Sequence, residues 1–255
     1  MTVLTISQIN ASECFITKEN DQIIQKEGDC DERFAPCSTF KIALSLIGFD
    51  SGILMDETHP VWSFKEGYDD WLPVWKQDQT PKSWMTYSCV WYSQVLTQNL
   101  GMKKFQDYIT QFNYGNQDLS GDKSKNNGLT HAWLSSSLAI SSIEQITFLE
   151  KLINETLPVK PHAITMTKNL IFLETLKNGW NLYGKTGTGH VLKNDKSKIR
   201  DVYHGWFVGW IEKDNRKIIF ASHITDSKKE ENFPSIRAKE RAKEKLEKII
   251  DQSEK

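Results

Sequence analysis

Several features that mark common protein classes are scarce or absent in this sequence. Its 255 residues carry 32 Lys and Arg against 33 Asp and Glu, a formal net charge of −1. This balance lacks the basic excess typical of nucleic-acid-binding proteins, so we expect no nucleic acid partner. No apolar run is long enough to span a membrane. Repeats and low-complexity tracts are also missing, which leaves a globular chain of one large or two modest domains.

Residues 1–12 lack the basic and apolar regions of a secretory signal peptide. An exported protein would therefore already have lost its signal.

Cysteine and histidine are sparse and are not arranged as metal ligands. The four cysteines, Cys14, Cys30, Cys37 and Cys89, have neither zinc-site spacing nor a Cys-x-x-Cys pair. They allow three disulfide connectivities, which the sequence does not rank. The six histidines form no metal motif, so we expect no metal site. Cys37 directly precedes Ser38, and we interpret it as a buried structural thiol rather than a nucleophile.

Residues 36–49 have apolar side chains on every side, which is typical of a helix buried all round. Ser38 and Lys41 open this helix, and their spacing of three places both side chains on one face, where hydroxyl and amine can meet. Free backbone N–H groups at the helix N-terminus suit an oxyanion. Burial disfavours the ammonium and lowers its pKa, so the neutral amine can act as a base. The pair predicts an activated serine.

Ser-x-x-Lys is a weak signal by itself, because about one copy is expected by chance in a chain of this length. A second copy does occur, at residues 120–123. It lies among Gly, Asp, Lys and Asn, which is the composition of a solvated loop. The first copy opens an apolar helix instead, and this context favours Ser38 and Lys41 as the catalytic pair.

Apolar patterns predict strands near both ends of the chain and helices between them. The predicted strands are an N-terminal hairpin and a late group, at residues 14–17, 22–25, 183–191, 205–211 and 217–224. The core helix is expected to end near residues 51–52, and residues 54–86 to be irregular with short helical pieces. Further helices are predicted as a broken pair over residues 90–112 and at 142–155, 162–178 and 235–252.

This arrangement predicts an α/β (α+β) fold in which both chain ends build one antiparallel sheet flanked by helices. Residues 1–53 and 180–255 then form the sheet domain, which includes the core helix. Residues 54–179 form an inserted, mainly helical domain. The crevice between the two is the expected active site.

Lys-Thr-Gly at residues 185–187 lies on the first late strand and overlaps a rival motif. Residues 179–186 match the phosphate-loop string G-x-x-x-x-G-K-T. A phosphate loop follows a strand and opens a helix, because its backbone N–H groups and the helix N-terminus hold the anion. Here a predicted helix precedes the string and a strand follows it, and Trp180 and Tyr183 are bulky for such a loop. Nucleotide binding is therefore a remote alternative.

With Ser-Thr-Phe-Lys at residues 38–41 and Lys-Thr-Gly at 185–187, the chain resembles the penicillin-recognising serine enzymes. Between these motifs lie Ser-Cys-Val at 88–90, Tyr-Gly-Asn at 114–116 and Trp-Leu-Ser-Ser-Ser-Leu at 133–138. The ordered set, over about residues 36–237, is similar to the class D, oxacillinase-type β-lactamases. The resemblance implies hydrolysis of β-lactam antibiotics, which are small molecules, through a serine acyl-enzyme.

The resemblance also implies catalytic roles. Ser38 is the expected nucleophile, and Lys41 is expected to be carbamylated by CO2 or bicarbonate and to act as general base in acylation and deacylation. No other cofactor is implied. Ser88 would pass a proton to the leaving lactam nitrogen with electrostatic support from Lys185. Backbone N–H groups of Ser38 and Thr188 would form the oxyanion hole.

A second set of residues is expected to bind the substrate or the carbamate. Its members are Val90, Trp133, Leu134, Thr186, Gly187 and Arg237. The Trp133 indole N–H, a donor only, would hold the carbamate. Val90 and Leu134 would be the apolar pair that limits water access. Thr186 and Arg237 would bind the substrate carboxylate, since a guanidinium matches a carboxylate at two points.

Other functions fit the same motifs less well. A β-lactam sensor domain shares them but stays acylated, and such receptors carry membrane spans. A peptidoglycan transpeptidase is disfavoured by the small size of the chain and by Ser-x-Val at residues 88–90.

We expect a periplasmic or secreted bacterial protein, as a monomer or homodimer. Substrate preference depends on loops at residues 63–87 and 190–203, and the sequence does not predict their conformation.

Overall fold

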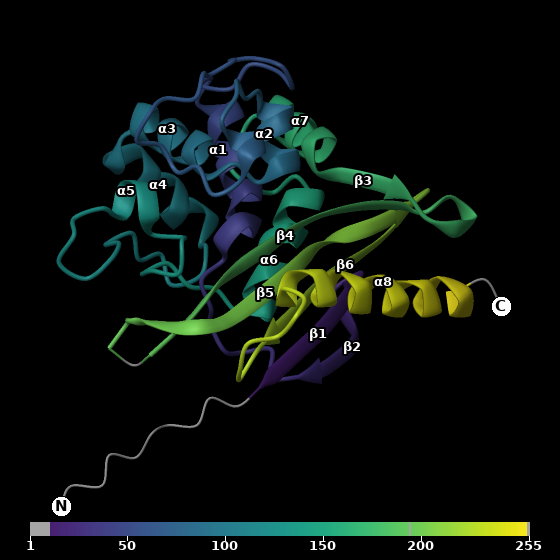
Figure 1. The fold of residues 1–255 in the computed structure, drawn as a ribbon. Coiled ribbons are helices and arrows are strands. Elements are labelled where there is room, and N and C mark those ends of the chain that lie inside the picture. Colours follow the sequence, from purple (N-terminus) through teal and green to yellow (C-terminus); the bar gives the residue numbers. More distant parts are fainter. Residues whose placement is uncertain (1–10, 194, 254–255) are drawn as a thin grey trace, which may run out of the picture.

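The sheet at the centre of the molecule is built from both ends of the chain. The structure is a computed structural model and describes residues 11–193 and 195–253. Its six strands are antiparallel and lie in the order β2-β1-β6-β5-β4-β3 (Figure 1). They are β1 (Ser12–Glu19), β2 (Gln22–Gly28), β3 (Phe172–Thr175), β4 (Asn181–Leu192), β5 (Lys198–Lys213) and β6 (Arg216–Thr225). The sheet predicted from the two chain ends is thus confirmed.

β1 ties the N-terminal hairpin to the strands of the last third of the chain. It pairs with β6 on one side and with β2 on the other. A disulfide between Cys14 and Cys30 closes the hairpin. None of the three connectivities that would pair all four cysteines forms, because the other two remain unpaired. In the chain-entropy view, a cross-link over 16 positions stabilises the fold by about 3 kcal/mol. Cys37 and Cys89 are buried free thiols.

One face of the sheet is covered by α8 (Pro234–Ser253), which lies in front of the strands in Figure 1. Its apolar positions recur every four residues and are fully buried, as Ala238, Ala242, Leu246 and Ile250 show. They pack with aromatic and aliphatic side chains of β1, β4, β5 and β6. The predicted terminal helix, with one buried and one charged side, is confirmed.

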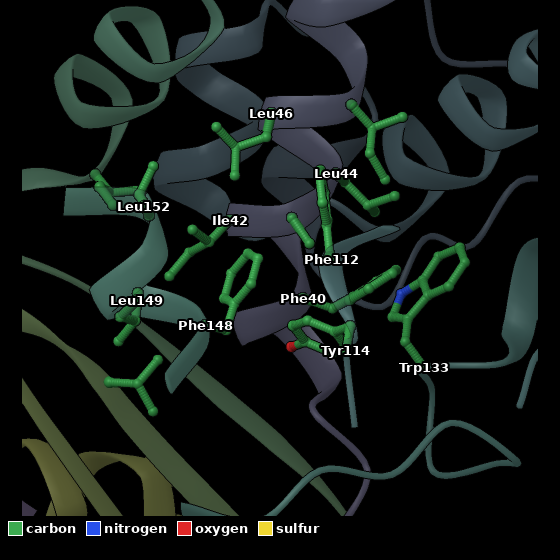
Figure 2. Packing of buried hydrophobic residues seen from close by; sticks show 14 of the residues in the cluster. Phe40, Ile42, Leu44, Leu46, Phe112, Tyr114, Trp133, Phe148, Leu149 and Leu152 are labelled. Atoms are coloured by element: carbon green, nitrogen blue, oxygen red, sulfur yellow. The ribbon is translucent and has the colours of Figure 1, made fainter. Parts of the chain in front are cut away.

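The other face carries the remaining helices, and α1 lies at their centre. They are η1 (Cys37–Phe40), α1 (Lys41–Asp50), η2 (Pro73–Trp75), α2 (Pro81–Tyr87), α3 (Val90–Leu100), α4 (Met102–Phe112), α5 (Gly128–His131), α6 (Ser142–Ile153), α7 (Pro161–Ile171) and η3 (Lys177–Gly179). Every residue of α1 from Lys41 to Phe49 is buried. Figure 2 shows its Ile42 and Leu46 among side chains of α4 and α6. The prediction of a helix buried all round is confirmed.

One predicted element is wrong. The helical pattern over residues 162–178 ends at Ile171, where α7 stops, and the next four residues form β3. Phe172 of this strand pairs with Tyr183 of β4, so tertiary pairing overrides the local helical pattern. β5 also starts at Lys198, earlier than the predicted strand at 205. The division into two domains stays a prediction.

Within the described part of the chain, the helices lack the combination of length and apolar character needed to cross a bilayer.

Candidate active site

Ser38 and Lys41 lie where the chain enters the central helix. Ser38 is in η1 and Lys41 is the first residue of α1, and the Lys41 Nζ donates to Ser38 Oγ at 3.5 Å. Lys41 has no exposed surface, and this burial lowers its pKa from 10.5 to about 8. The neutral amine is therefore easier to reach near neutral pH than for an exposed lysine, in the direction predicted from the sequence. The pair can deliver an activated hydroxyl.

The backbone before Ser38 is held in an unusual conformation. Cys37 has a φ of +49°, a left-handed value that few non-glycine residues adopt. Its N–H donates to the Trp133 carbonyl at 3.0 Å, which connects the nucleophile's segment to the loop after α5. Such strain persists only where the surroundings fix it, and here it directs Ser38 toward the cavity.

A second serine–lysine pair faces the first. Ser88 follows α2 in a left-handed conformation, with a φ of +56°, and Lys185 lies on β4. Lys185 Nζ donates to Ser88 Oγ at 2.5 Å. Burial first, and the charge of Lys41 second, lower the pKa of Lys185 to about 7. Because the charge of Lys41 acts on Lys185, both pairs belong to one site.

β4 passes so close to the nucleophile's segment that glycine is required there. A Cβ at Gly187 would lie 2.9 Å from the Pro36 carbonyl oxygen and 3.1 Å from the Ser38 nitrogen. A Cβ at Gly189 would lie 2.4 Å from Cys37 Sγ. The Lys-Thr-Gly strand therefore lies against the start of the central helix, and this contact brings motifs from distant parts of the sequence together.

Trp133 is buried under the same site without a partner for its ring nitrogen. Its side chain has no exposed surface, and Nε1 makes no hydrogen bond. The indole packs on Phe40 and Phe105, with ring centroids 5.5 and 6.2 Å away, and Figure 2 shows it beside Phe40. A buried N–H without an acceptor costs about 1–3 kcal/mol, so the position calls for an acceptor group.

A cavity of about 890 Å³ opens over these groups. Of the predicted site residues, the structure places Ser38, Ser88, Val90, Leu134, Thr186, Gly187 and Thr188 in its wall. Lys41, Trp133 and Lys185 are buried, and the two lysines reach the lining serines by hydrogen bonds. We call this space the active-site cavity.

Arg237 is placed differently from the other predicted residues. It is not among the described residues that line the active-site cavity. Its Nη2 forms an ion pair with the Asp226 carboxylate, which is 4 % exposed, and its Nε donates to the Asn232 carbonyl at 3.2 Å. The carboxylate-binding role expected from the sequence would require the side chain to leave Asp226.

The cavity also has walls that the motifs did not reveal. They include Trp71, Leu72, Trp75, His190, Lys198, Tyr203, Phe233 and Ser235. Ser235 lies at the start of α8 and accepts a 2.5 Å hydrogen bond from Thr188 Oγ1. The only sequence signal for these residues was their position in the aperiodic, tryptophan-rich stretch and beside the predicted strands. Nothing local shows which of them face inward.

The two free cysteines, which precede Ser38 and follow Ser88 in the chain, are poor nucleophiles. Burial raises the pKa of both Cys37 and Cys89 to about 11, so both are thiols at neutral pH. Cys37 Sγ lies 4.0 Å from Ser135 Oγ. The structure therefore agrees with the interpretation of Cys37 as a buried structural thiol.

The phosphate-loop alternative fails on geometry. Gly184, Lys185 and Thr186 lie inside β4 and pair in register with β5 residues 207–209. A strand paired along its length does not offer the curved row of free N–H groups that phosphate requires, and no helix follows it.

The described residues contain no cluster of three or more His, Cys, Asp and Glu side chains suited to a metal ion. What they do contain is a serine beside a buried lysine whose pKa is lowered, and a second serine–lysine pair. A neutral amine can take the proton of Ser38, and the Ser88–Lys185 pair can return one to a leaving group. The site is that of a serine enzyme acting by acyl transfer.

The comparisons with known proteins agree with this class. Residues 15–247 match the family described as the penicillin binding protein transpeptidase domain. The chain is 44% identical to Beta-lactamase OXA-1 of Escherichia coli over 90% of this chain and 82% of that protein. The crystal structure of the class D β-lactamase OXA-427 superposes with a TM-score of 0.90 at 45% identity, covering 94% of this chain and 99% of that one.

A receptor domain is also similar, at lower identity. The C-terminal domain of the Bacillus licheniformis BlaR penicillin-receptor gives a TM-score of 0.78 at 30% identity, covering 94% of this chain and 90% of that one. The chain belongs to the penicillin binding protein transpeptidase family, and within it to the class D serine β-lactamases.

Proposed function

We propose that this protein hydrolyses β-lactam antibiotics through an acyl-enzyme on Ser38, with Lys41 as its general base in carbamylated form. The observation that carries the proposal is the Ser38–Lys41 pair at 3.5 Å, buried beneath a cavity beside the second pair of Ser88 and Lys185. The relatives named β-lactamase, at 44% identity, support the same reaction.

The surroundings of Lys41 fit a carbamate. Only a neutral amine adds CO2, and burial provides that form by lowering the pKa of Lys41 to about 8. Trp133 Nε1 is a buried donor without an acceptor, and an anionic oxygen on Lys41 would be a suitable one. When formed, the carbamate supplies a base that is already negative at neutral pH.

In acylation, Ser38 Oγ attacks the lactam carbonyl and loses its proton to the base. The carbonyl C–N bond breaks, and Ser88 passes a proton to the departing nitrogen while Lys185 supports it through their 2.5 Å hydrogen bond. Backbone N–H groups of Ser38 and Thr188 would stabilise the oxyanion, which the close approach of β4 to η1 supports. In deacylation, water adds to the ester and releases Ser38.

The substrate carboxylate is proposed to bind at Thr186 and Arg237. Thr186 lines the cavity, together with the hydrogen-bonded hydroxyls of Thr188 and Ser235. Val90 and Leu134 line the cavity near Ser38, where apolar side chains restrict the approach of water. Gly187 is required by the contact with η1 and leaves its backbone free to face the substrate.

Intact mass spectrometry after brief and long exposure to benzylpenicillin tests the proposal. We expect a penicilloyl adduct that appears within the mixing time and disappears as penicillin is consumed, and no adduct on Ser38→Ala. Ser51→Ala, which changes a serine at the opposite end of α1, is the matched control and should behave as wild type.

An adduct that persists for hours without turnover would instead support a β-lactam sensor. The similarity to the BlaR receptor domain is the observation that favours this second candidate. Absence of any adduct would overturn both. The higher identity to the named β-lactamases makes hydrolysis the better supported function.

The Cys14–Cys30 disulfide supports an oxidising compartment, since such bonds rarely persist in a reducing cytosol. We therefore propose that the protein works in the periplasm or outside the cell.

A further inference from the structure

A second cavity lies beside the active-site cavity and shares part of its wall. Its volume is about 640 Å³, and we call it the outer cavity. Asp122, Lys125, Ser135 and Lys198 line both spaces. These four side chains therefore form the boundary between the two spaces.

The chemistry of the two spaces differs. The active-site cavity has apolar walls, such as Trp71, Leu72, Val90 and Leu134. Among the described residues, the lining of the outer cavity is made wholly of Ser, Asp, Lys and a single Gly. An apolar substituent would leave that polar wall without partners, whereas a hydrophilic substituent can hydrogen-bond to it.

Three consecutive serines, at residues 135–137, line the outer cavity. Ser136 is only 8 % exposed, and its Oγ makes no hydrogen bond in the structure. Its neighbours Ser135 and Ser137 differ, since Ser135 Oγ accepts from the His190 N–H at 2.9 Å and Ser137 Oγ donates to the Asp118 carbonyl at 2.8 Å. The Ser136 Oγ atom itself is buried and lies near the Asp122 carboxylate, so Ser136 forms part of the wall and is not a free donor to a ligand.

Lys198 supplies a positive charge at the boundary of the two cavities. Within the described ranges it has no carboxylate partner, whereas Lys125 pairs with Asp122 at 3.4 Å. The Asp122 carboxylate also accepts a hydrogen bond from Asn127 at 3.1 Å, so its negative charge is already compensated by these two partners. Four lysines and three aspartates line the outer cavity. Lys125 and Lys198 also line the active-site cavity, and of these two Lys198 is the one without a carboxylate partner among the described residues.

The position of Lys198 indicates which end of a substrate it meets. Lys198 pairs with Leu192 of β4, six residues beyond Thr186. At about 3.3 Å per residue this separation is roughly 20 Å along the strand. The backbone of Lys198 therefore lies at the end of β4 remote from Thr186, while its charge acts on His190 and Cys37. From there Lys198 can meet the far end of an elongated ligand.

We propose that the outer cavity is a subsite for the anionic, hydrophilic end of a β-lactam acylamino side chain, with Lys198 as its cation. The inference rests on the proposed function and adds a substrate class to it: β-lactams that carry a second carboxylate. Lys198 is a specificity-determining residue, and it takes no part in acylation.

A matched pair of substrates isolates the effect of the second carboxylate. The first is the penicillin with a 6-adipoylamino side chain, which ends in a carboxylate, and the second is its terminal carboxamide. Wild-type protein should show a kcat/KM about three- to fivefold higher for the acid, as expected for a solvent-accessible ion pair. Lys198→Gln should bring the ratio to about one, and Lys198→Glu should bring it below one.

Lys193→Gln is the control, because Lys193 is exposed in the same hairpin but is not among the described residues that line either cavity. It should keep the wild-type ratio. In 0.5 M NaCl the wild-type ratio should fall toward one, since salt screens an accessible pair.

Two outcomes overturn the inference while leaving the proposed function intact. In the first, both penicillins are hydrolysed and the wild-type ratio is one. In the second, Lys198→Gln slows both substrates equally, which would mean that Lys198 acts on the core carboxylate or on the site as a whole. Failure of the wild-type protein to hydrolyse either penicillin would instead count against the proposed function.

Discussion

Lys185 Nζ donates a 2.5 Å hydrogen bond to Ser88 Oγ, although 97 positions separate the two residues in the chain. Ser88 reaches this place because it ends α2 in a left-handed conformation, and Lys185 because β4 passes behind it. In the proposed mechanism this pair, together with Ser38 and Lys41, carries a proton from the nucleophile to the leaving group.

Ser88→Ala should slow acylation by about 10²- to 10⁴-fold, the usual contribution of a positioned proton donor. The single-turnover rate of acylation by benzylpenicillin, followed by rapid-quench mass spectrometry, measures this directly. Tyr87→Phe changes the exposed neighbour and should leave the rate as in wild type. An acylation rate unchanged in Ser88→Ala would remove Ser88 from the proton path.

Trp133→Phe should raise the bicarbonate concentration needed for half-maximal turnover by about tenfold. The substitution keeps an aromatic ring against Phe40 but deletes the buried N–H proposed to hold the carbamate. High bicarbonate should then restore much of the lost rate. Trp180→Phe is the matched control, because Trp180 also has a buried Nε1 without a partner, but in the core beneath α8. Equal bicarbonate dependence in both variants would contradict the assignment.

Arg237→Ala should raise KM for benzylpenicillin by about tenfold with little change in kcat, if Arg237 leaves Asp226 to bind the substrate carboxylate. Asp226→Asn weakens the ion pair that holds Arg237 away from the cavity, so it should keep KM or lower it. Steady-state kinetics of the two variants separate this role from a structural one. A similar rise of KM in both variants would show that the pair matters only for the placement of α8.

Stability should fall as pH drops from about 6.5 to about 3, because the folded protein keeps His204 neutral. Burial lowers the pKa of His204 to about 3, and its Nδ1 lies 3.1 Å from His223 Nε2. In that window His204 is protonated in the unfolded chain and neutral in the folded chain. The free energy of unfolding therefore falls by up to about 1.4 kcal/mol for each pH unit of acidification. Urea unfolding between pH 4 and 7 measures the slope.

His204→Gln should make that slope shallower. His162→Gln, at an exposed histidine, should leave it as in wild type. If His204→Gln keeps the full slope, the acid sensitivity belongs to other groups.

Local sequence predicted the elements that depend on local patterns. The Ser38–Lys41 pair follows from helical spacing in an apolar segment, and the strands near both ends follow from alternation. The edge strand β3 was missed because its four residues continue a helical pattern, and only β4 fixes them as a strand. Contacts across long separations could not be derived from local patterns: the motif resemblance assigned Ser88 and Lys185 their roles, but their distance needed the fold.

The same limit applies to the cavity walls. Lys198 and Ser235 reach the site through the register of β5 and the packing of α8 on the sheet. Arg237 was assigned by its motif, yet the ion pair with Asp226 that holds it depends on a residue outside that motif.

Carbon-13 NMR of the protein in ¹³C-bicarbonate tests the central claim most directly, since it detects a carbamate on Lys41 without relying on turnover. The account predicts a carbamate resonance in wild type that is absent in Lys41→Ala, together with a Lys41→Ala acyl-enzyme that bicarbonate does not release. A fully active wild-type protein with no such resonance, or normal turnover by Lys41→Ala, would contradict it.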